Sequence, residues 1–276
     1  MRIEISHRSE YSYDADGGTT VQALRLTPPG GGSQTIEQWR IEAPGLEEAA
    51  SYNDAYGNRV HLIASGGQTG PLVVAAQGVV VTTDTAGVVG WTGEAATPAI
   101  YLRETLRTAP SAGIRALAEA VREVRDGSLA ETATLHALME RIHAEVDYRI
   151  SSTDAGTSAA AAYEGKLGVC QDHAHIFISA ARCLGIPARY TTGYLLTESA
   201  DADAAHHAWA EALLPGIGWT GFDPANNTCP TDRYIRLAVG LDAGIAAPIR
   251  GVRRGPGSET LVVTVAVRQA SQQLSQ

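Results

Sequence analysis

The hydrophobic pattern of this chain changes its period near Pro98, and that change limits the folds open to it. Before this point, short segments alternate apolar and polar residues between glycine-rich turns, as antiparallel β structure does. After it, apolar residues recur with helical spacing, and alternation returns beyond Pro187. We therefore expect an α+β fold, with a β-rich sandwich or barrel in residues 1–95 and a second domain in residues 96–276.

Short alternating runs mark the candidate strands of the N-terminal domain. They are Arg2–Ile5, Tyr11–Tyr13, Val21–Leu26, Ile36–Ile41, Arg59–Ile63, Leu72–Ala76 and Val79–Val81. His7 and His61 fall in this region and are interpreted as ordinary sheet residues. Near the other end of the chain, Thr260–Val267 is expected to be a buried strand because it is apolar throughout except for its threonines. Residues 233–254 follow neither period clearly.

Two helices are expected after the change of period. The first presents Ile114, Leu117, Ala118, Val121 and Val124 on one face and ends at Asp126-Gly127, and the second presents Leu135, Leu138, Met139, Ile142 and Val146. His136 and His143 also lie on the second helix. We interpret them as part of a solvated face rather than as a metal or catalytic site. Residues 151–162 are expected to form a polar connection of small residues.

A further helical pattern begins at Cys170. The apolar stripe continues through Ala174, Phe177, Ala181 and Leu184, and Gly185 and Pro187 end the helix. Cys170 thus lies at a helix N-terminus on the inward side, where free N–H groups and the helix dipole favour a thiolate. The alternative at this stage is a buried cysteine that acts only as a small apolar side chain.

Two strands are expected next, His207–Leu213 and Trp219–Asp223. If Leu213 pairs with Trp219 across a five-residue loop, Asp223 lies diagonal to His207 on the same face of the sheet. The backbone positions are then about 7–8 Å apart, within reach of the two side chains. A four-residue loop would place them on opposite faces. His206 points to the other face and is interpreted as structural.

Cys170, His207 and Asp223 supply the three groups that a cysteine enzyme needs to cleave an amide bond. The thiolate attacks the carbonyl, the imidazolium keeps the sulfur charged and later protonates the leaving amine, and the carboxylate orients the imidazole. The intermediate also needs hydrogen-bond donors for its oxyanion. The backbone N–H of Cys170 is one candidate donor, and the side chain of Tyr148 is the candidate for the second.

A zinc site would compete for the same region, with Cys170, His173, His175 and Cys183 as possible ligands. Positions 170 and 175 diverge by about 140° on one helix, so their side chains do not converge on one ion. We therefore expect neither a metal nor a cofactor. Cys183 and Cys229 are interpreted as non-catalytic. Asp172 is interpreted as a carboxylate at a helix N-terminus, and Glu211 as a charge on a strand face.

The composition excludes some classes of partner and favours one compartment. A formal net charge of −9 repels nucleic acid and anionic lipid, so neither is an expected partner. No apolar run approaches the roughly 20 residues that span a bilayer, and the N-terminus lacks the apolar region of a signal peptide. Three cysteines do not form a disulfide framework. We expect a cytoplasmic protein whose substrate is a peptide, a protein or a small amide; the oligomeric state is not indicated.

Several separate blocks of this sequence closely resemble the bacterial transglutaminase-like family. They are Gly168–His175, Leu184–Tyr190, Gly193-Tyr194, His207–Trp209 and Gly218–Pro224. The resemblance is strong over residues 140–255. It implies a papain-like core of helices packed on an antiparallel sheet, with Cys170 as nucleophile, His207 as base and acid, and Asp223 as the orienting carboxylate. Leu24–Pro28 and Asp54–Asn58 resemble the β-rich domain that precedes this core in many members.

Three positions depart from the pattern of that family. His173 stands where many relatives carry an aromatic residue such as Phe, and Ala225 stands where they usually carry Thr. The segment Leu241–Pro248 keeps little of the Arg-Asp-Tyr run of the relatives. None of these departures touches the three candidate catalytic residues, but all concern the surroundings of the site.

The resemblance implies acyl transfer from an amide to Cys170 through a thioester, followed by release to water or to an amine. We expect hydrolysis, since water is always present and no amine site is evident in the sequence. The first alternative is a protein-glutamine transamidase that uses an amine acceptor. The second is a non-catalytic interaction module that retains the fold. The N-terminal domain is expected to restrict access to the thiol or to bind part of the substrate.

Overall fold

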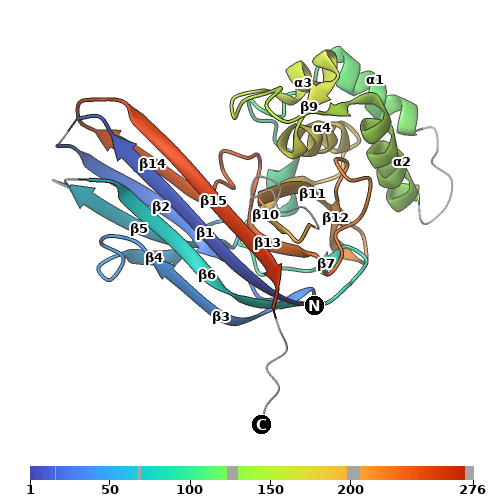
Figure 1. Cartoon of the computed structure of the whole chain (residues 1–276). Coiled ribbons are helices and arrows are strands. Elements are labelled where there is room, and N and C mark those ends of the chain that lie inside the picture. Colours follow the sequence, from blue (N-terminus) through green and yellow to red (C-terminus); the bar gives the residue numbers. More distant parts are fainter. Residues whose placement is uncertain (16, 67–69, 123–129, 198–205, 271–276) are drawn as a thin grey trace, which may run out of the picture.

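The computed structural model describes residues 1–15, 17–66, 70–122, 130–197 and 206–270. It consists of two parts that lie side by side in Figure 1. Two packed β-sheets form one part, which we call the sandwich, and a third sheet covered by helices forms the other, which we call the helical lobe. The predicted α+β fold is confirmed, and the N-terminal region is a sandwich rather than a barrel.

The sandwich consists of two four-stranded antiparallel sheets. One has the order β15 (Glu259–Gln269), β1 (Arg2–Tyr13), β6 (Leu72–Thr82) and β3 (Gln34–Glu42); the other has β14 (Ile249–Arg254), β2 (Thr19–Thr27), β5 (Arg59–Gly66) and β4 (Ala50–Asn53). Alternate residues of β1 and β2 point inward, including Ile3, Ile5, Leu24 and Leu26. The alternation seen in the sequence therefore reflects one face of each strand in the shared interior.

The helical lobe is built on a five-stranded antiparallel sheet. Its order is β13 (Tyr234–Gly240), β10 (Ala188–Leu195), β11 (His206–Leu214), β12 (Gly218–Phe222) and β7 (Val88–Gly90). The helices are α1 (Ala112–Arg122), α2 (Ala130–Glu145), α3 (Ala159–Gly165) and α4 (Cys170–Cys183), with a 3₁₀ turn at Pro98–Leu102 and a two-stranded ladder of β8 (Asp147-Tyr148) and β9 (Leu167-Gly168). The inward faces predicted for α1 and α2 are confirmed, except that Val124 and the end at Asp126-Gly127 lie outside the described residues.

One helix was not predicted and another is more buried than predicted. α3 occupies part of the stretch interpreted as a connection; Ser158 caps it by accepting a hydrogen bond from the N–H of Ala161, but its run of alanines carries no amphipathic pattern. α4 is not a surface helix with one apolar stripe. Asp172 through Arg182 are all buried, because α4 lies between the sheet and the other three helices.

The sandwich attaches to the free edge of β13 through two side-chain amides. Asn58 donates from Nδ2 to the carbonyl of Val239 and accepts from its N–H, both at 2.8 Å. Gln34 does the same with the backbone of Arg236, at 2.9 and 2.8 Å. Each amide thus pairs with β13 as a neighbouring strand would. These contacts satisfy backbone groups that an edge strand otherwise leaves open.

The two parts do not follow the division into residues 1–95 and 96–276. β14 and β15, from the C-terminal end, pair with β2 and β1 of the sandwich, whereas β7 pairs with β12 of the helical lobe. The predicted strand at Thr260–Val267 exists, but it is not buried: Leu261, Val262 and Val263 are 48%, 57% and 44% exposed. β15 has a neighbour on one side only, and an apolar run in the sequence does not distinguish such an edge strand from a central one.

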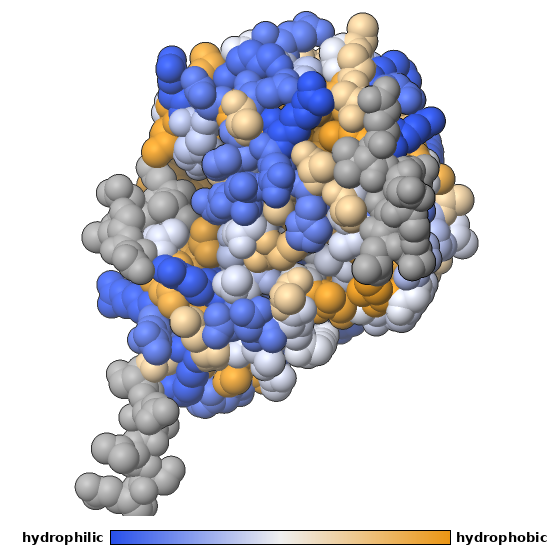
Figure 2. Space-filling view, turned by 90° about the vertical axis from the view of Figure 1, so that its right-hand side faces the viewer, coloured by the Kyte–Doolittle hydropathy of each residue, from blue (hydrophilic) through white to orange (hydrophobic). Residues whose placement is uncertain are grey.

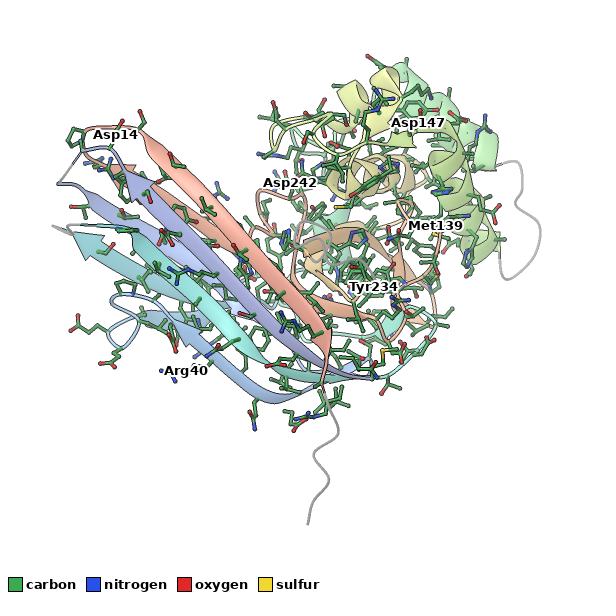
Figure 3. The ribbon with its side chains drawn as sticks, viewed as in Figure 1. Asp14, Arg40, Met139, Asp147, Tyr234 and Asp242 are labelled. Atoms are coloured by element: carbon green, nitrogen blue, oxygen red, sulfur yellow. The ribbon has the colours of Figure 1, made fainter. Side chains whose placement is uncertain are left out.

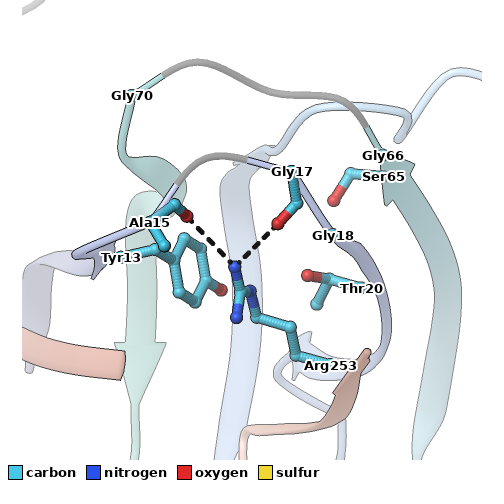
Figure 4. A pocket seen from close by; sticks show the side chains of 9 residues that line it. All are labelled: Tyr13, Ala15, Gly17, Gly18, Thr20, Ser65, Gly66, Gly70 and Arg253. Atoms are coloured by element: carbon cyan, nitrogen blue, oxygen red, sulfur yellow. Dashed lines mark hydrogen bonds between the residues drawn. The ribbon is translucent and has the colours of Figure 1, made fainter. Parts of the chain in front are cut away.

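The tip of the sandwich contains a small cavity. A cavity of about 30 Å³ at the tip of the sandwich is closed by Arg253, which lies over the ring of Tyr13 and donates to the carbonyls of Ala15 and Gly17 (Figure 4). It could hold little more than a water molecule. On the face shown in Figure 2, hydrophobic residues are scattered among hydrophilic ones. Among the described residues, none of the helices combines the length and the apolar character needed to cross a bilayer.

Candidate active site

Cys170 begins α4, as its position in the sequence predicted. Val169, the residue before it, has an extended backbone and accepts hydrogen bonds from the N–H groups of Asp172 and His173. The N–H of Cys170 itself belongs to the first turn and has no partner within the helix. The thiol is half-buried and packs against the interior of the helical lobe. It therefore lies at the positive end of a helix, beside a backbone N–H that the helix itself does not use.

The side chains of His207 and Asp223 are in contact, as the prediction of a five-residue loop requires. Leu213 pairs with Trp219, so the predicted register is confirmed. Nε2 of His207 lies 2.7 Å from Oδ2 of Asp223, and both side chains are buried. His206, the preceding residue on β11, hydrogen-bonds instead to Thr192 at 3.1 Å. One face of β11 thus carries the histidine of the site, and the other carries a histidine with a different partner.

Cys170 interacts with the imidazole of His207. A hydrogen bond between the thiol and this imidazole is one of the interactions that act on the protonation of His207. Burial alone would favour the neutral ring, but the charge of Asp223 and the hydrogen bonds to Asp223 and Cys170 raise the pKa of His207 to about 10. The three groups predicted from the sequence therefore lie in one chain of contacts, in the order thiol, imidazole, carboxylate.

Asp223 is held by more donors than the sequence indicated. Oδ2 accepts from Nδ2 of Asn226 at 2.7 Å and from the hydroxyl of Tyr234 at 2.8 Å, and Oδ1 accepts from the N–H of Ala225 at 3.1 Å. Burial opposes ionisation, but His207 and these donors lower the pKa of Asp223. Asn226 and Tyr234 were missed because one lies in a turn and the other in a segment without a clear pattern.

Aromatic rings enclose the imidazole of His207. The ring of Trp209 is stacked beside it at a centroid distance of 6.3 Å, and the ring of Tyr234 meets it edge-on at 5.9 Å. Tyr234, labelled in Figure 3, lies inside the helical lobe, far from the tip of the sandwich marked by Asp14. The rings restrict the rotation of His207 and keep water from its bond with Asp223.

Tyr148 lies beside the thiol. Its hydroxyl interacts with the backbone N–H of Cys170, and burial together with the nearby Cys170 and Asp223 raises the pKa of Tyr148 to about 12. The phenol therefore remains protonated at neutral pH and can donate a hydrogen bond. β8 brings it there, because Tyr148 pairs with Gly168 of β9, two residues before α4 begins at Cys170. Tyr148 was named from the sequence as a candidate oxyanion donor, and in the structure it lies next to Cys170.

The other polar residues near the start of α4 have partners of their own. Asp172 accepts from the N–H of Val169 at 2.9 Å and from the hydroxyl of Thr153, which fixes the backbone just before the thiol. His175 is fully buried; its Nε2 accepts from the N–H of Ala243, and burial lowers its pKa to about 3. The contact with Ala243 uses the side chain of His175, which the zinc hypothesis would require as a ligand.

Glu211 lies on a strand face, as interpreted, but it is fully buried between Arg189 and Arg236, at 2.7 and 2.8 Å. These two cations outweigh the effect of burial and lower the pKa of Glu211 to about 2. The face of α2 that carries His136 and His143 is only partly solvated. The first packs edge-on against Phe222, and Nδ1 of the second lies 3.1 Å from the carbonyl oxygen of Pro224, beside Asp223.

The other two cysteines have different surroundings from Cys170. Burial raises the pKa of Cys183 at the end of α4 and of Cys229 in the loop before β13. A higher pKa means a smaller fraction of reactive thiolate at neutral pH. Among the three cysteines, Cys170 has both a helix N-terminus and an imidazole beside it.

Comparisons with known proteins agree with this arrangement. Residues 118–224 match the transglutaminase-like superfamily, and residues 3–81 match the bacterial transglutaminase-like N-terminal region. An uncharacterized protein of Mycobacterium leprae is 26% identical over 279 residues, covering 96% of this chain and 98% of the relative. An uncharacterized protein of Mycobacterium tuberculosis is 28% identical over 289 residues, covering 96% and 91%.

A solved structure from Cytophaga hutchinsonii, described as a "Putative Cysteine Protease", has a similar fold. It superposes with a TM-score of 0.73 and 22% sequence identity, covering 100% of this chain and 93% of the other. The superposition extends over both the sandwich and the helical lobe. The arrangement of the two parts is therefore shared with that protein.

Proposed function

We propose that this chain, which belongs to the transglutaminase-like superfamily, is a cysteine enzyme that cleaves a peptide or amide bond by hydrolysis. The observation that carries the proposal is the chain of contacts from the Cys170 thiol through His207 to Asp223. A thiol paired with an imidazole that is itself fixed by a buried carboxylate is the arrangement that activates a sulfur nucleophile. We assign the roles of nucleophile, acid and base, and orienting group to these three residues.

The reaction would begin with attack of the Cys170 thiolate on the carbonyl carbon of the substrate. The resulting oxyanion would accept a hydrogen bond from the N–H of Cys170, and the hydroxyl of Tyr148 would be the second donor. His207, as the imidazolium, would give its proton to the leaving amine as the C–N bond breaks and a thioester forms. Water, deprotonated by the now neutral His207, would attack the thioester and release the carboxylic acid and the thiol.

An amine could replace water in the second step, which would make the chain a transamidase. The chemistry at Cys170 would be the same, so the three groups do not favour one acceptor. We propose hydrolysis because water is always available as an acceptor, whereas an amine acceptor has to be supplied. A protein-glutamine transamidase is the alternative, and a peptide screen with and without a labelled primary amine would separate the two. Incorporation of the amine faster than release of acid would overturn hydrolysis.

The proposal places the enzyme in a reducing cytoplasm, with a peptide, a protein or a small amide as substrate. Three unpaired cysteines favour such a compartment. The sandwich is proposed to bind part of the substrate or to limit access to the thiol. The screen would use Cys170→Ala as its inactive control.

Selective alkylation tests whether the thiol is activated at all. Iodoacetamide at neutral pH should label Cys170 at least about 10-fold faster than Cys183 or Cys229, because Cys170 has a cationic partner and the other two thiols have raised pKa values. Peptide mass mapping over time would give the three rates. In the His207→Ala variant, the rate at Cys170 should fall towards the other two.

The same experiment separates the enzyme from a non-catalytic module that retains the fold. Equal labelling of the three cysteines in a folded protein would favour the module and would contradict the proposed activation. His61→Ala in β5 is the matched control, since it removes an imidazole from the sandwich. Its labelling pattern should equal that of the unchanged protein.

A further inference from the structure

His173 makes two hydrogen-bond contacts that a neutral histidine cannot both satisfy. It lies in the first turn of α4, and its side chain is buried, at 1% exposure. Nδ1 lies 2.9 Å from the carbonyl oxygen of Val169, and Nε2 lies 3.0 Å from the carbonyl oxygen of Val146. A carbonyl oxygen only accepts hydrogen bonds, so each ring nitrogen must carry a hydrogen to make its contact.

A neutral imidazole carries one N–H group and would direct the lone pair of its other nitrogen at a carbonyl oxygen. The imidazolium carries two N–H groups and satisfies both acceptors. We infer that His173 is held as the imidazolium and that its charge stabilises the thiolate of Cys170, an inference that rests on the cysteine enzyme proposed above. His173 thereby acts as a positioning residue for charge and does not itself touch the substrate.

The place of His173 on α4 brings its charge close to the sulfur. Residues three apart on a helix are neighbours on its surface, with Cβ atoms about 5–6 Å apart. Tyr148 lies at the same corner: its ring centroid is 6.0 Å from that of His173, and it also interacts with Cys170. The imidazolium and the positive end of α4 therefore both favour the thiolate form of Cys170.

The charged groups around His173 are compatible with a buried cation. Asp172, the adjacent residue on α4, is fully buried and interacts electrostatically with His173. One of its oxygens, Oδ1, has no hydrogen-bond partner among the described residues, so its negative charge is not fully compensated by donors. Glu145, next to Val146, is engaged by Arg141 and Lys166. Of these two carboxylates, Asp172 is the one for which the described residues provide no such ion pair, and it adjoins His173 on α4.

Two cations on different elements would then flank the thiol. His207 reaches it from β11, and His173 lies beneath it in the first turn of α4. Removal of His207 alone should leave part of the thiolate in place, because the second charge remains. The acid limb of the activity should also extend to lower pH than one imidazolium would allow, since an additional opposite charge favours the ionised sulfur.

Protonation of His173 can be measured directly by ¹⁵N NMR of the full chain labelled at histidine side chains. The His173→Phe variant, which keeps a ring of similar size, assigns the signals. At pH 7 both ring nitrogens of His173 should show the shifts of protonated N–H groups. A signal of one unprotonated nitrogen at pH 7 would overturn the inference. This measurement needs no turnover, so it stands even if the proposed enzyme activity fails.

The effect on the sulfur is measured by the pH profile of Cys170 alkylation. In His173→Phe the midpoint of the profile should move up by about one pH unit, so that alkylation below the midpoint is about 10-fold slower. His136→Phe, on the partly buried face of α2, is the control and should leave the profile unchanged. An unchanged midpoint in folded His173→Phe would overturn the role of the charge.

Two further variants keep the test decisive. If His173→Phe does not fold, His173→Gln keeps one donor and removes the charge, and it should give the same shift of the midpoint. Cys170→Ala removes the thiolate, so His173 should lose its proton at a lower pH than in the unchanged protein, because the coupling acts in both directions. Loss of turnover with normal NMR and normal alkylation profiles would count against the proposed enzyme and leave the inference on His173 intact.

Discussion

The carboxylate of Asp223 accepts hydrogen bonds from several of the residues that form the candidate site. It is fully buried, yet it is ionised, because His207 and several donors compensate its charge. Asn226 and Tyr234 donate to the same oxygen that binds the imidazole. The orientation of His207 thus depends on residues outside the proposed catalytic three. Such supporting contacts are expected to matter for rate more than for stability.

Tyr234→Phe tests this dependence. The change removes one hydrogen bond to a buried carboxylate and keeps the ring that packs on His207, so kcat/KM should fall about 10-fold on a substrate found by the screen. Steady-state kinetics at neutral pH provide the measurement. Tyr52→Phe, on the exposed strand β4, is the matched control. Equal rates for both variants would show that Asn226 and the backbone suffice to hold Asp223.

Sequence reasoning reached the three residues proposed to react but not those that hold them. Cys170, His207 and Asp223 were found because a helix start and a strand register are encoded in periodic patterns. The turn that carries Asn226 has no period, and Tyr234 begins a strand in a stretch that gave no clear pattern. The burial of Glu211 was not foreseen, because a strand pattern shows which face a charge lies on, but not that two arginines cover it.

At the scale of elements, β13 connects the two parts of the molecule. It provides Tyr234 to the site, and its outer edge pairs with the side chains of Asn58 and Gln34 from the sandwich. The sandwich therefore stabilises the strand that holds the carboxylate, although it contributes none of the three candidate catalytic residues. This is a more specific connection than the substrate-binding role expected from the sequence.

Asn58→Ala should destabilise the protein by roughly 3 kcal/mol, because it leaves the buried N–H and C=O of Val239 without partners. Urea unfolding followed by tryptophan fluorescence would measure the change. Asn53→Ala, on the exposed strand β4, is the control and should change stability by less than about 0.5 kcal/mol. A similarly small effect in Asn58→Ala would mean that water replaces the amide at this edge.

The success of the sequence prediction also differed between elements. The inward face of α2 was predicted correctly, whereas β1 was predicted only as two short runs, Arg2–Ile5 and Tyr11–Tyr13, of one continuous strand. α3 was missed because seven residues, mostly alanine, carry no periodic signal. β15 was predicted as a strand but with the wrong burial, because the position of a strand in its sheet depends on partners far away in the chain.

At the scale of the whole molecule, buried neutral histidines make stability depend on pH. Burial lowers the pKa of His7 and His175 to about 3 and that of His206 to about 4. His7 and His206 line a cavity of about 330 Å³ between the sandwich and the helical lobe. Protonation of either ring would place a charge at the junction of the two parts.

The direction of the effect follows from linkage. Each of these histidines has a folded pKa below the unfolded value of about 6.5, so the unfolded chain binds more protons between the two values. Their contribution to stability is complete above about pH 6.5 and is lost as the pH falls towards 4. His207 acts in the opposite direction: its raised pKa stabilises the fold below about pH 6.5, and that contribution is lost as the pH rises through about 10.

His7→Gln should therefore make the acid side of the stability curve less steep. The amide keeps hydrogen-bonding capacity towards Tyr194 and Ser9 but does not titrate, so the slope between pH 6 and 5 should fall by about 1.4 kcal/mol per pH unit. Chemical unfolding at several pH values would measure it. Above pH 7 the two curves should run parallel. An unchanged slope in the variant would contradict the proposed role of His7.

The pairing of β1 with β15 has a consequence for how the molecule is made. β1 lies in the middle of its sheet, between β6 and β15, and the register joins Ile3 to Gln269. During synthesis the first strand leaves the ribosome long before its last neighbour exists. The nascent chain must therefore keep one side of β1 open until β15 has left the ribosome. The sandwich is completed only then, whereas the helical lobe, whose strands and helices lie between β1 and β15 in the chain, can fold earlier.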